Sequence, residues 1–340
     1  ELYCAGHFFQ AAAAQERAGK AHSLLPIARK LADHLVSTFG PSGKPGVPGH
    51  PEVEMALVEL YRATQERRYL ELAQSFIDQR GRGLIGGSAY HVDHRPLREM
   101  HQLAGHAVRA LYLCSGAADV YLETGETALL TALQRLWQQM VSSQVYITGG
   151  LGARHDGEAF GEPYELPNAR AYAETCAAIA SLYWNARMQK IQPNAAYADL
   201  FEWTLYNAVL PGLSQDGVEY FYVNPLCSTG ADRRKSWYEC ACCPPNLARL
   251  LADLPGHIYS TSLDFAQGSE RHKPDGVSTA RMHVTPGVWV HQYASSIASL
   301  PLGNGRTLRL SQSSNYPWNG ELRIEILAIE GNRAAQSSRS

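Results

Sequence analysis

The sequence predicts a mainly α-helical protein, built from helical hairpins in series and followed by the start of a β-sheet domain. Apolar residues recur with helical periodicity through residues 1–260. Short polar turns such as "ETGE" separate these segments, and such turns make neighbouring helices antiparallel. Beyond residue 278 the period changes to two, as in "TLRLSQ" and "ELRIEIL", which is typical of β-strands.

Nine helical segments are expected, which make about four hairpins and one further helix: 1–17, 22–38, 52–65, 68–80, 103–124, 127–142, 171–189, 194–211 and 246–260. Hairpins in series bury their apolar stripes against one another in a solenoid or a closed toroid. A toroid of six hairpins has twelve helices, so nine fit a toroid that lacks its first helices. The opening "ELYCAGH" lies inside an amphipathic pattern without a capping residue, and we expect further sequence upstream in the natural protein.

The change of period also gives the expected domains. We place the helical domain at residues 1–264 and the strands of a β-sandwich at residues 278–330. The stretch "FAQGSERHKPDG" (265–276) has the composition of an exposed link, and residues 331–340 are expected to form a disordered tail.

Composition excludes several classes of function. The hydrophobic fraction of 45% and the charged fraction of 18% suit a packed globule. A net charge of −2 gives no electrostatic reason to expect nucleic acid or an anionic membrane surface as a partner, and no apolar run is long enough for a bilayer span. Seven cysteines are too few for a disulfide scaffold, which favours the cytoplasm, and the sequence leaves a homodimer open.

Three cysteines crowd into "YECACCPPN", directly before a helical segment. Because proline suits the first turn of a helix, Cys242 and Cys243 are expected at a helix N-terminus, where backbone amides favour thiolates. Adjacent thiolates repel each other unless a cation lies between them, and zinc is the usual cation. Two more ligands are available in "AETCAA", Glu174 and Cys176, also at a helix start. Spacing leaves open whether Cys240 is a ligand, and whether these residues are instead buried free thiols or a redox pair.

The segment between the two half-sites is a long irregular connection rich in carboxylates. Such loops often carry function, and this one contains Asp156, Glu158, Glu162, Glu165 and Glu174. His50 and His106 each follow a glycine at the start of a helix, which places them at the same rim of a toroid. The aromatic stretch "EYFYVNPL" (219–226) is expected either to flank a sugar or to form core.

Seven motifs in this order resemble glycoside hydrolase family 127, the zinc-dependent β-L-arabinofuranosidases: "ELYCAGH", "GHPEVEMALVELY", "GHAVR", "GGLGARHDGEAF", "YELPN", "ETCA" and "CACCPPN". The resemblance runs from residue 1 to about residue 320. It implies an (α/α)6 barrel, incomplete at its N-terminus, followed by β-sandwich strands. It also implies a retaining hydrolase that releases terminal β-L-arabinofuranosyl residues from oligosaccharides or glycoconjugates.

The resemblance further assigns roles to individual residues. Cys242 would be the nucleophile and Glu158 the general acid/base. The implied zinc ligands are Glu174, Cys176, Cys242 and Cys243. The positions implied to touch the sugar are His50, His106 and Tyr222.

Two other readings of the sequence stay open. The first is another (α/α)6 enzyme acting on carbohydrates, such as a sugar epimerase or an unsaturated-uronide hydrolase. The second is a glycan-binding protein in which a zinc ion is purely structural.

Overall fold

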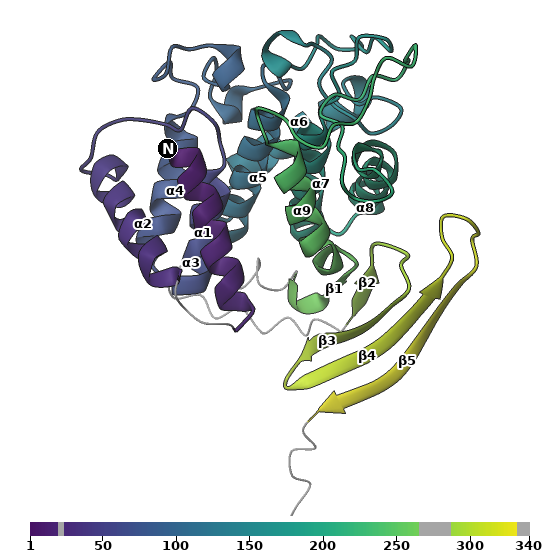
Figure 1. Cartoon of the computed structure of the whole chain (residues 1–340). Helices are drawn as coiled ribbons and strands as arrows, with labels where there is room; N and C mark the ends of the chain where they lie inside the picture. Colours follow the sequence, from purple (N-terminus) through teal and green to yellow (C-terminus); the bar gives the residue numbers. More distant parts are fainter. Residues whose placement is uncertain (20–23, 265–286, 332–340) are drawn as a thin grey trace, which may run out of the picture.

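The computed structural model describes residues 1–19, 24–264 and 287–331, and within these ranges the chain folds as helices followed by a small sheet (Figure 1). The α-helices of this part are α1 Leu2–Arg17, α2 Leu25–Phe39, α3 Val53–Thr64, α4 Arg67–Gln79, α5 Ala107–Thr124, α6 Thr127–Ser143, α7 Thr175–Ile191, α8 Ala195–Thr204 and α9 Cys243–Asp253. None of the described helices has the length and apolarity that a membrane crossing requires.

The helices form two layers, as expected for serial hairpins. The odd-numbered helices α1, α3, α5, α7 and α9 pack in sequence against one another, and α2, α4, α6 and α8 lie outside them (Figure 1). The sequence explains the layers: α2 buries only the stripe Ala28, Ala32 and Leu35, whereas α5 is buried along most of its length. Gly116 of α5 allows close packing, since a Cβ there would lie 2.9 Å from the Glu54 side chain of α3. The predicted helical fold class is confirmed.

Two inner helices begin later than their periodicity predicts. The expected starts at residues 103 and 171 are wrong, because α5 begins at Ala107 and α7 at Thr175. Gly105 has φ +72° and Ala173 has φ 41°, and neither value is compatible with a right-handed helix. These left-handed residues end the loops and place His106 and Glu174 at the N-caps.

The last two predicted helices also differ from the structure. Instead of running to residue 211, α8 ends at Thr204 and continues as a π turn at Leu205–Val209 and a 3-10 turn at Leu210–Gly212. The helix expected at 246–260 begins at Cys243, because its two prolines fit the first turn, and it ends at Asp253. A 3-10 turn follows at Leu254–His257.

Strand β1, Tyr259–Thr261, lies inside the predicted helical domain and pairs with β2, Val288–Val290. The expectation that strands begin only after residue 278 is therefore wrong. The three-residue strand is too short to show a period of two, and its partner is far along the chain. The predicted boundary at residue 264 thus cuts a β-ladder rather than separating helices from strands.

The remaining strands form an antiparallel sheet in the order β3–β4–β5, with bounds Ser296–Gly303, Arg306–Ser314 and Leu322–Gly331. The central strand β4 buries Leu308, Leu310 and Gln312 on one face. The predicted turn "NYPWNG" joins β4 to β5. The predicted link at 265–276, the predicted strand residues 278–286 and the predicted tail from residue 332 lie outside the described residues.

Candidate active site and metal centre

Three inner helices begin at one end of the helical domain, where the long loops gather (Figure 1). The N-cap residues are His106 of α5, Glu174 of α7 and Cys242 of α9. Alternating helices in a hairpin array point the same way, so residues far apart in sequence meet at one rim. The structure thus places these three residues at one rim, as the sequence predicted.

Four predicted ligands lie together between the starts of α7 and α9: Glu174, Cys176, Cys242 and Cys243. Their ligand atoms all lie within 4.8 Å of one another. The sulfur of Cys176 is 3.4 Å from that of Cys243, which is 3.7 Å from that of Cys242. Glu174 Oε1 lies 3.5 Å from Cys242 Sγ and 3.8 Å from Cys243 Sγ.

The quartet fits a tetrahedral metal ion. Ligands at about 2.3 Å from a common centre are about 3.8 Å apart in a tetrahedron, which is close to the observed separations. Glu174 Oε2 is buried without a hydrogen-bond partner, and it therefore lacks the donor that a buried carboxylate needs. Three sulfurs and one carboxylate form a donor set suited to zinc.

The four groups of the quartet shift one another's pKa values. Burial raises the pKa of the Cys176 and Cys243 thiols, and burial together with the charge on Cys242 raises that of Glu174. Hydrogen bonds from Cys176 and Cys243 lower the pKa of Cys242. Cys242 is also the least buried sulfur of the quartet.

Local hydrogen bonds hold the start of α7 against the loop that carries Tyr222. Thr175 donates its backbone N–H to Tyr222 O at 3.0 Å and its hydroxyl to Phe221 O at 2.8 Å. Asn224 donates to Ala173 O at 2.9 Å. The "EYFYVNPL" stretch therefore lines the site and also supports it.

Glu158 lies beside the quartet at the centre of a second cluster. An oxygen of Glu158 lies within 4.8 Å of both an oxygen of Glu174 and a nitrogen of His106. His106 Nε2 is 2.8 Å from Glu158 Oε2. Tyr172 Oη donates to Glu158 Oε1 at 2.8 Å, and Tyr222 Oη is 3.5 Å from the same oxygen. The hydrogen bond from His106, followed by that from Tyr172, lowers the pKa of Glu158 despite its partial burial.

His50 joins this cluster through ring contacts. Its ring centroid lies 5.5 Å from that of His106 and 5.8 Å from that of Tyr112. Burial lowers the pKa of His50 to about 3, so the ring is neutral. His50 Nδ1 is 2.7 Å from the carbonyl of Pro51 and donates to it, which leaves Nε2 as an acceptor for a ligand hydroxyl.

The structure separates the remaining candidates from the site. Cys240 is exposed and is not part of the quartet. Glu162 lies 4.0 Å from Arg154, and Glu165 forms a short ion pair with the same arginine. Glu165 therefore stabilises the loop and is not part of the site. The sequence reasoning missed Tyr172, whose hydroxyl donates to Glu158, and no pattern in the sequence pointed to it.

Comparisons with known proteins agree with this geometry. Residues 1–256 match the family model described as β-L-arabinofuranosidase, GH127 catalytic domain. A non-reducing end β-L-arabinofuranosidase from Bifidobacterium longum subsp. longum is 36% identical over 359 residues, which cover 96% of this chain and 51% of that protein.

Two solved structures are similar over almost the whole chain. One, described as a GH127 β-arabinofuranosidase, is 40% identical with a TM-score of 0.84 over 96% of this chain and 48% of its own. The other is a GH127 β-L-arabinofuranosidase from Geobacillus stearothermophilus T6. It is 38% identical, with a TM-score of 0.82, over 95% of this chain and 52% of its own. The chain thus spans about half the length of these relatives.

Proposed function

The chain belongs to the GH127 β-L-arabinofuranosidase family, and from this premise we propose that it carries the active site of an enzyme that removes terminal β-L-arabinofuranosyl residues. The substrate would be an arabinofuranose-containing oligosaccharide or glycoconjugate. One observation supports the proposal above the others: a carboxylate, Glu158, lies beside a thiol-rich quartet that includes a partly exposed sulfur, Cys242. Such a pair supplies an acid/base and a nucleophile at one sugar-sized site.

We propose that the quartet holds zinc, with Glu174, Cys176, Cys242 and Cys243 as its ligands. The donor set and the atom separations support this assignment. When bound, zinc would hold Cys242 as a thiolate near neutral pH.

In the first step Glu158 donates a proton to the leaving oxygen while Cys242 Sγ attacks the anomeric carbon. The carbon–oxygen bond breaks, a carbon–sulfur bond forms, and the leaving group departs as an alcohol. In the second step Glu158 takes a proton from water, which attacks the same carbon and displaces the sulfur. Two displacements at one carbon give net retention of configuration.

Glu158 must therefore work in two protonation states, and its neighbours favour each in turn. The hydrogen bonds from His106 and Tyr172 favour the carboxylate, which the second step needs. Negative charge on Cys242 raises the pKa of Glu158 and so favours the protonated acid, which the first step needs. The sulfur no longer carries this charge once the carbon–sulfur bond has formed. The proton on Glu158 is thus coupled to the state of the sulfur.

The other predicted residues surround the place where the sugar would lie. His50 offers Nε2 as an acceptor, and Tyr222 Oη lies between Glu158 and the quartet. His106 holds Glu158 in place through its Nε2. These contacts support substrate-binding roles for His50 and Tyr222, and they place His106, predicted to touch the sugar, beside the same space with its Nε2 on Glu158.

Kinetics of the full-length protein with nitrophenyl and methyl β-L-arabinofuranosides test the proposal. We expect Cys242→Ser to abolish turnover, whereas Cys227→Ser, which changes an exposed thiol outside the site, leaves it unchanged. Glu158→Gln should slow methyl glycoside cleavage by about 10²–10⁴-fold. It should slow the first step with the nitrophenyl glycoside less, because nitrophenolate leaves without a proton. Near-normal turnover by Cys242→Ser would refute the nucleophile assignment.

A second measurement separates catalysis from a purely structural zinc. A cysteine-directed arabinofuranose mimic should add covalently to Cys242, and mass spectrometry would locate the adduct. Zinc content measured alongside should match one ion per chain. A protein that binds zinc, forms no adduct and cleaves neither glycoside would support the structural-zinc reading.

The cytoplasmic location and the homodimer stay predictions.

A further inference from the structure

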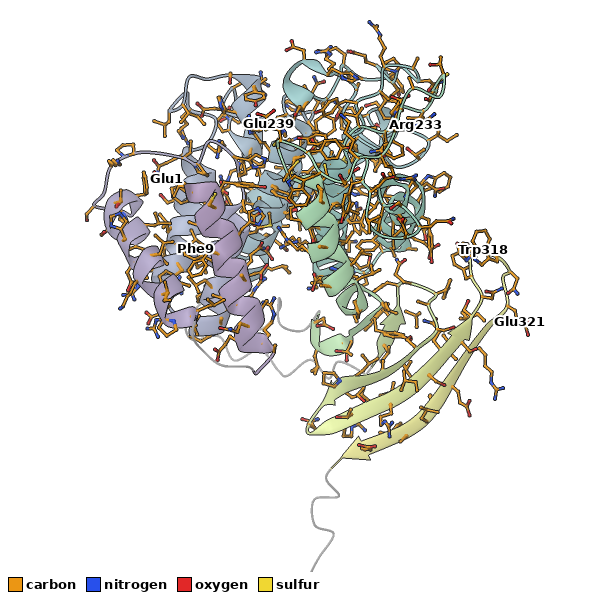
Figure 2. The ribbon with its side chains drawn as sticks, viewed as in Figure 1. Glu1, Phe9, Arg233, Glu239, Trp318 and Glu321 are labelled. Atoms are coloured by element: carbon orange, nitrogen blue, oxygen red, sulfur yellow. The ribbon has the colours of Figure 1, made fainter. Side chains whose placement is uncertain are left out.

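A hollow of about 570 Å³ opens beside the candidate site. Its lining residues are Tyr222, Lys235, Trp237, Tyr238, Glu239 and Cys240. Figure 2 shows Glu239 at the loop end of the helical domain, whereas Trp318 lies in the turn between β4 and β5. Apart from Tyr222, none of the lining residues has a role in the proposed chemistry.

The floor of this hollow is held in place by hydrogen bonds. Tyr238 Oη donates to Tyr220 O at 2.7 Å and accepts from Tyr222 N at 3.1 Å, and the rings of Tyr222 and Tyr238 contact each other at 5.4 Å. Trp237 is 60% exposed, although an indole ring gains little from contact with water. The hollow therefore combines fixed tyrosines with an aromatic surface that has no protein partner covering most of it.

The hollow also borders both reacting groups. Tyr222, which lines it, has its hydroxyl 3.5 Å from Glu158 Oε1. Cys240, which also lines it, accepts a backbone hydrogen bond from Cys242 at 3.0 Å. The acid/base must reach the leaving oxygen, so the leaving group would lie next to Glu158, whose side chain is 31% exposed. His106 is more buried, with 7% of its side chain exposed, and the cleaved sugar would be enclosed on that side.

Resting on the proposed function, we propose that this hollow binds the departing sugar of the substrate, with Trp237 as its stacking surface. A sugar ring presents an apolar face of C–H groups and a rim of hydroxyls. The exposed indole can stack on the apolar face, and the Lys235 ammonium and the Glu239 carboxylate can hydrogen-bond to the hydroxyls. A methyl aglycone would reach neither. The enzyme is thus expected to prefer a sugar over an alkyl group on the leaving side.

The test compares kcat/KM for a β-L-arabinofuranosyl disaccharide with kcat/KM for methyl β-L-arabinofuranoside, using the full-length protein. Trp237→Ala should lower the disaccharide-to-methyl ratio about tenfold, the effect of losing one stacked ring, and Trp237→Phe should recover part of it. The matched control is Trp318→Ala, which removes an 84% exposed tryptophan distant from the hollow and should leave the ratio at the wild-type value.

The outcomes distinguish this inference from the function on which it rests. A wild-type ratio in Trp237→Ala, with both substrates cleaved, would refute the subsite and leave the proposed function intact. Equal losses with both substrates in Trp237→Ala would also refute it, because they would indicate a structural role. If the wild-type protein cleaved neither substrate, the proposed function would fail and this inference with it.

Discussion

The fully buried guanidinium of Arg80 gives the sharpest prediction of stability. Its Nη2 lies 3.5 Å from Glu54 Oε1 and donates to Pro48 O at 2.5 Å, while its Nη1 donates to His91 O at 2.9 Å. Arg80 therefore joins α3 to the two loops that carry Pro48 and His91. Arg80→Met keeps much of the side-chain volume and removes the charge and all three contacts.

The magnitude follows from what the substitution leaves behind. Breaking a buried ion pair by removing one partner costs about 3–5 kcal/mol, and unpaired carbonyls add to this cost. Burial already raises the pKa of Glu54, while Arg80 opposes the rise, so in the variant the carboxyl would take up a proton rather than stay charged. This escape limits the loss, and we expect the free energy of unfolding to fall by about 3–4 kcal/mol at pH 7.

The same argument predicts a pH dependence. The pKa of Glu54 is raised in the folded state above its unfolded value of 4.5. Its contribution to the free energy of unfolding is therefore fully present below pH 4.5 and is lost as pH rises through the folded-state pKa. The deficit of Arg80→Met should therefore be larger at pH 8 than at pH 5. Adding Glu54→Gln should remove this dependence.

Urea unfolding of the full-length protein, followed by circular dichroism, measures both effects. The matched control is Arg82→Met, which changes an exposed arginine two residues away and should stay within about 0.5 kcal/mol of wild type. An Arg80→Met variant within about 1 kcal/mol of wild type, or with a deficit independent of pH, would show that the buried pair does not stabilise the fold as argued.

Three other predictions concern the fold and the metal. Gly105→Ala should lower Tm sharply or prevent folding, because its Cβ would lie 1.7 Å from Ala89 O at φ +72°; an unchanged melting curve would contradict the loop geometry. Asp119→Asn should cost about 3–5 kcal/mol at pH 7, since Asp119 is buried between Arg62 and Arg187. Burial alone would raise the pKa of Asp119 but the two arginines lower it, so the deficit should shrink as pH falls below about 4, and a constant deficit would argue against the ion pairs. Chelation of zinc should lower Tm, and added zinc should restore it, unless the quartet binds no metal.

The sequence was informative where chemistry and local backbone agree. The prolines after Cys243 fixed a helix start, and that start brought Cys242 and Cys243 to the rim. Spacing did not exclude Cys240, because only the fold shows that this residue faces solvent. The partnership between Tyr172 and Glu158 depends on where two loops meet, which periodicity does not report.

Boundaries were predicted less well than elements, for a physical reason. The apolar pattern of α7 extends back to Ala171, yet the left-handed backbone at Ala173 and the hydrogen bond from Asn224 make the helix begin later, at Thr175. The hollow beside Trp237 was not predicted either, because an exposed aromatic residue in a loop has no periodic signature. Tertiary contacts decided each of these features.

The meeting of helix starts at one rim has a consequence for biosynthesis. Glu174 and Cys242 are separated by 68 residues, so the half-site on α7 leaves the ribosome well before its counterpart on α9 is made. A growing polypeptide therefore carries its thiols apart, and closing that long loop is the step that creates the reactive centre. The proposed chemistry therefore becomes possible only once the start of α9 has packed against the start of α7.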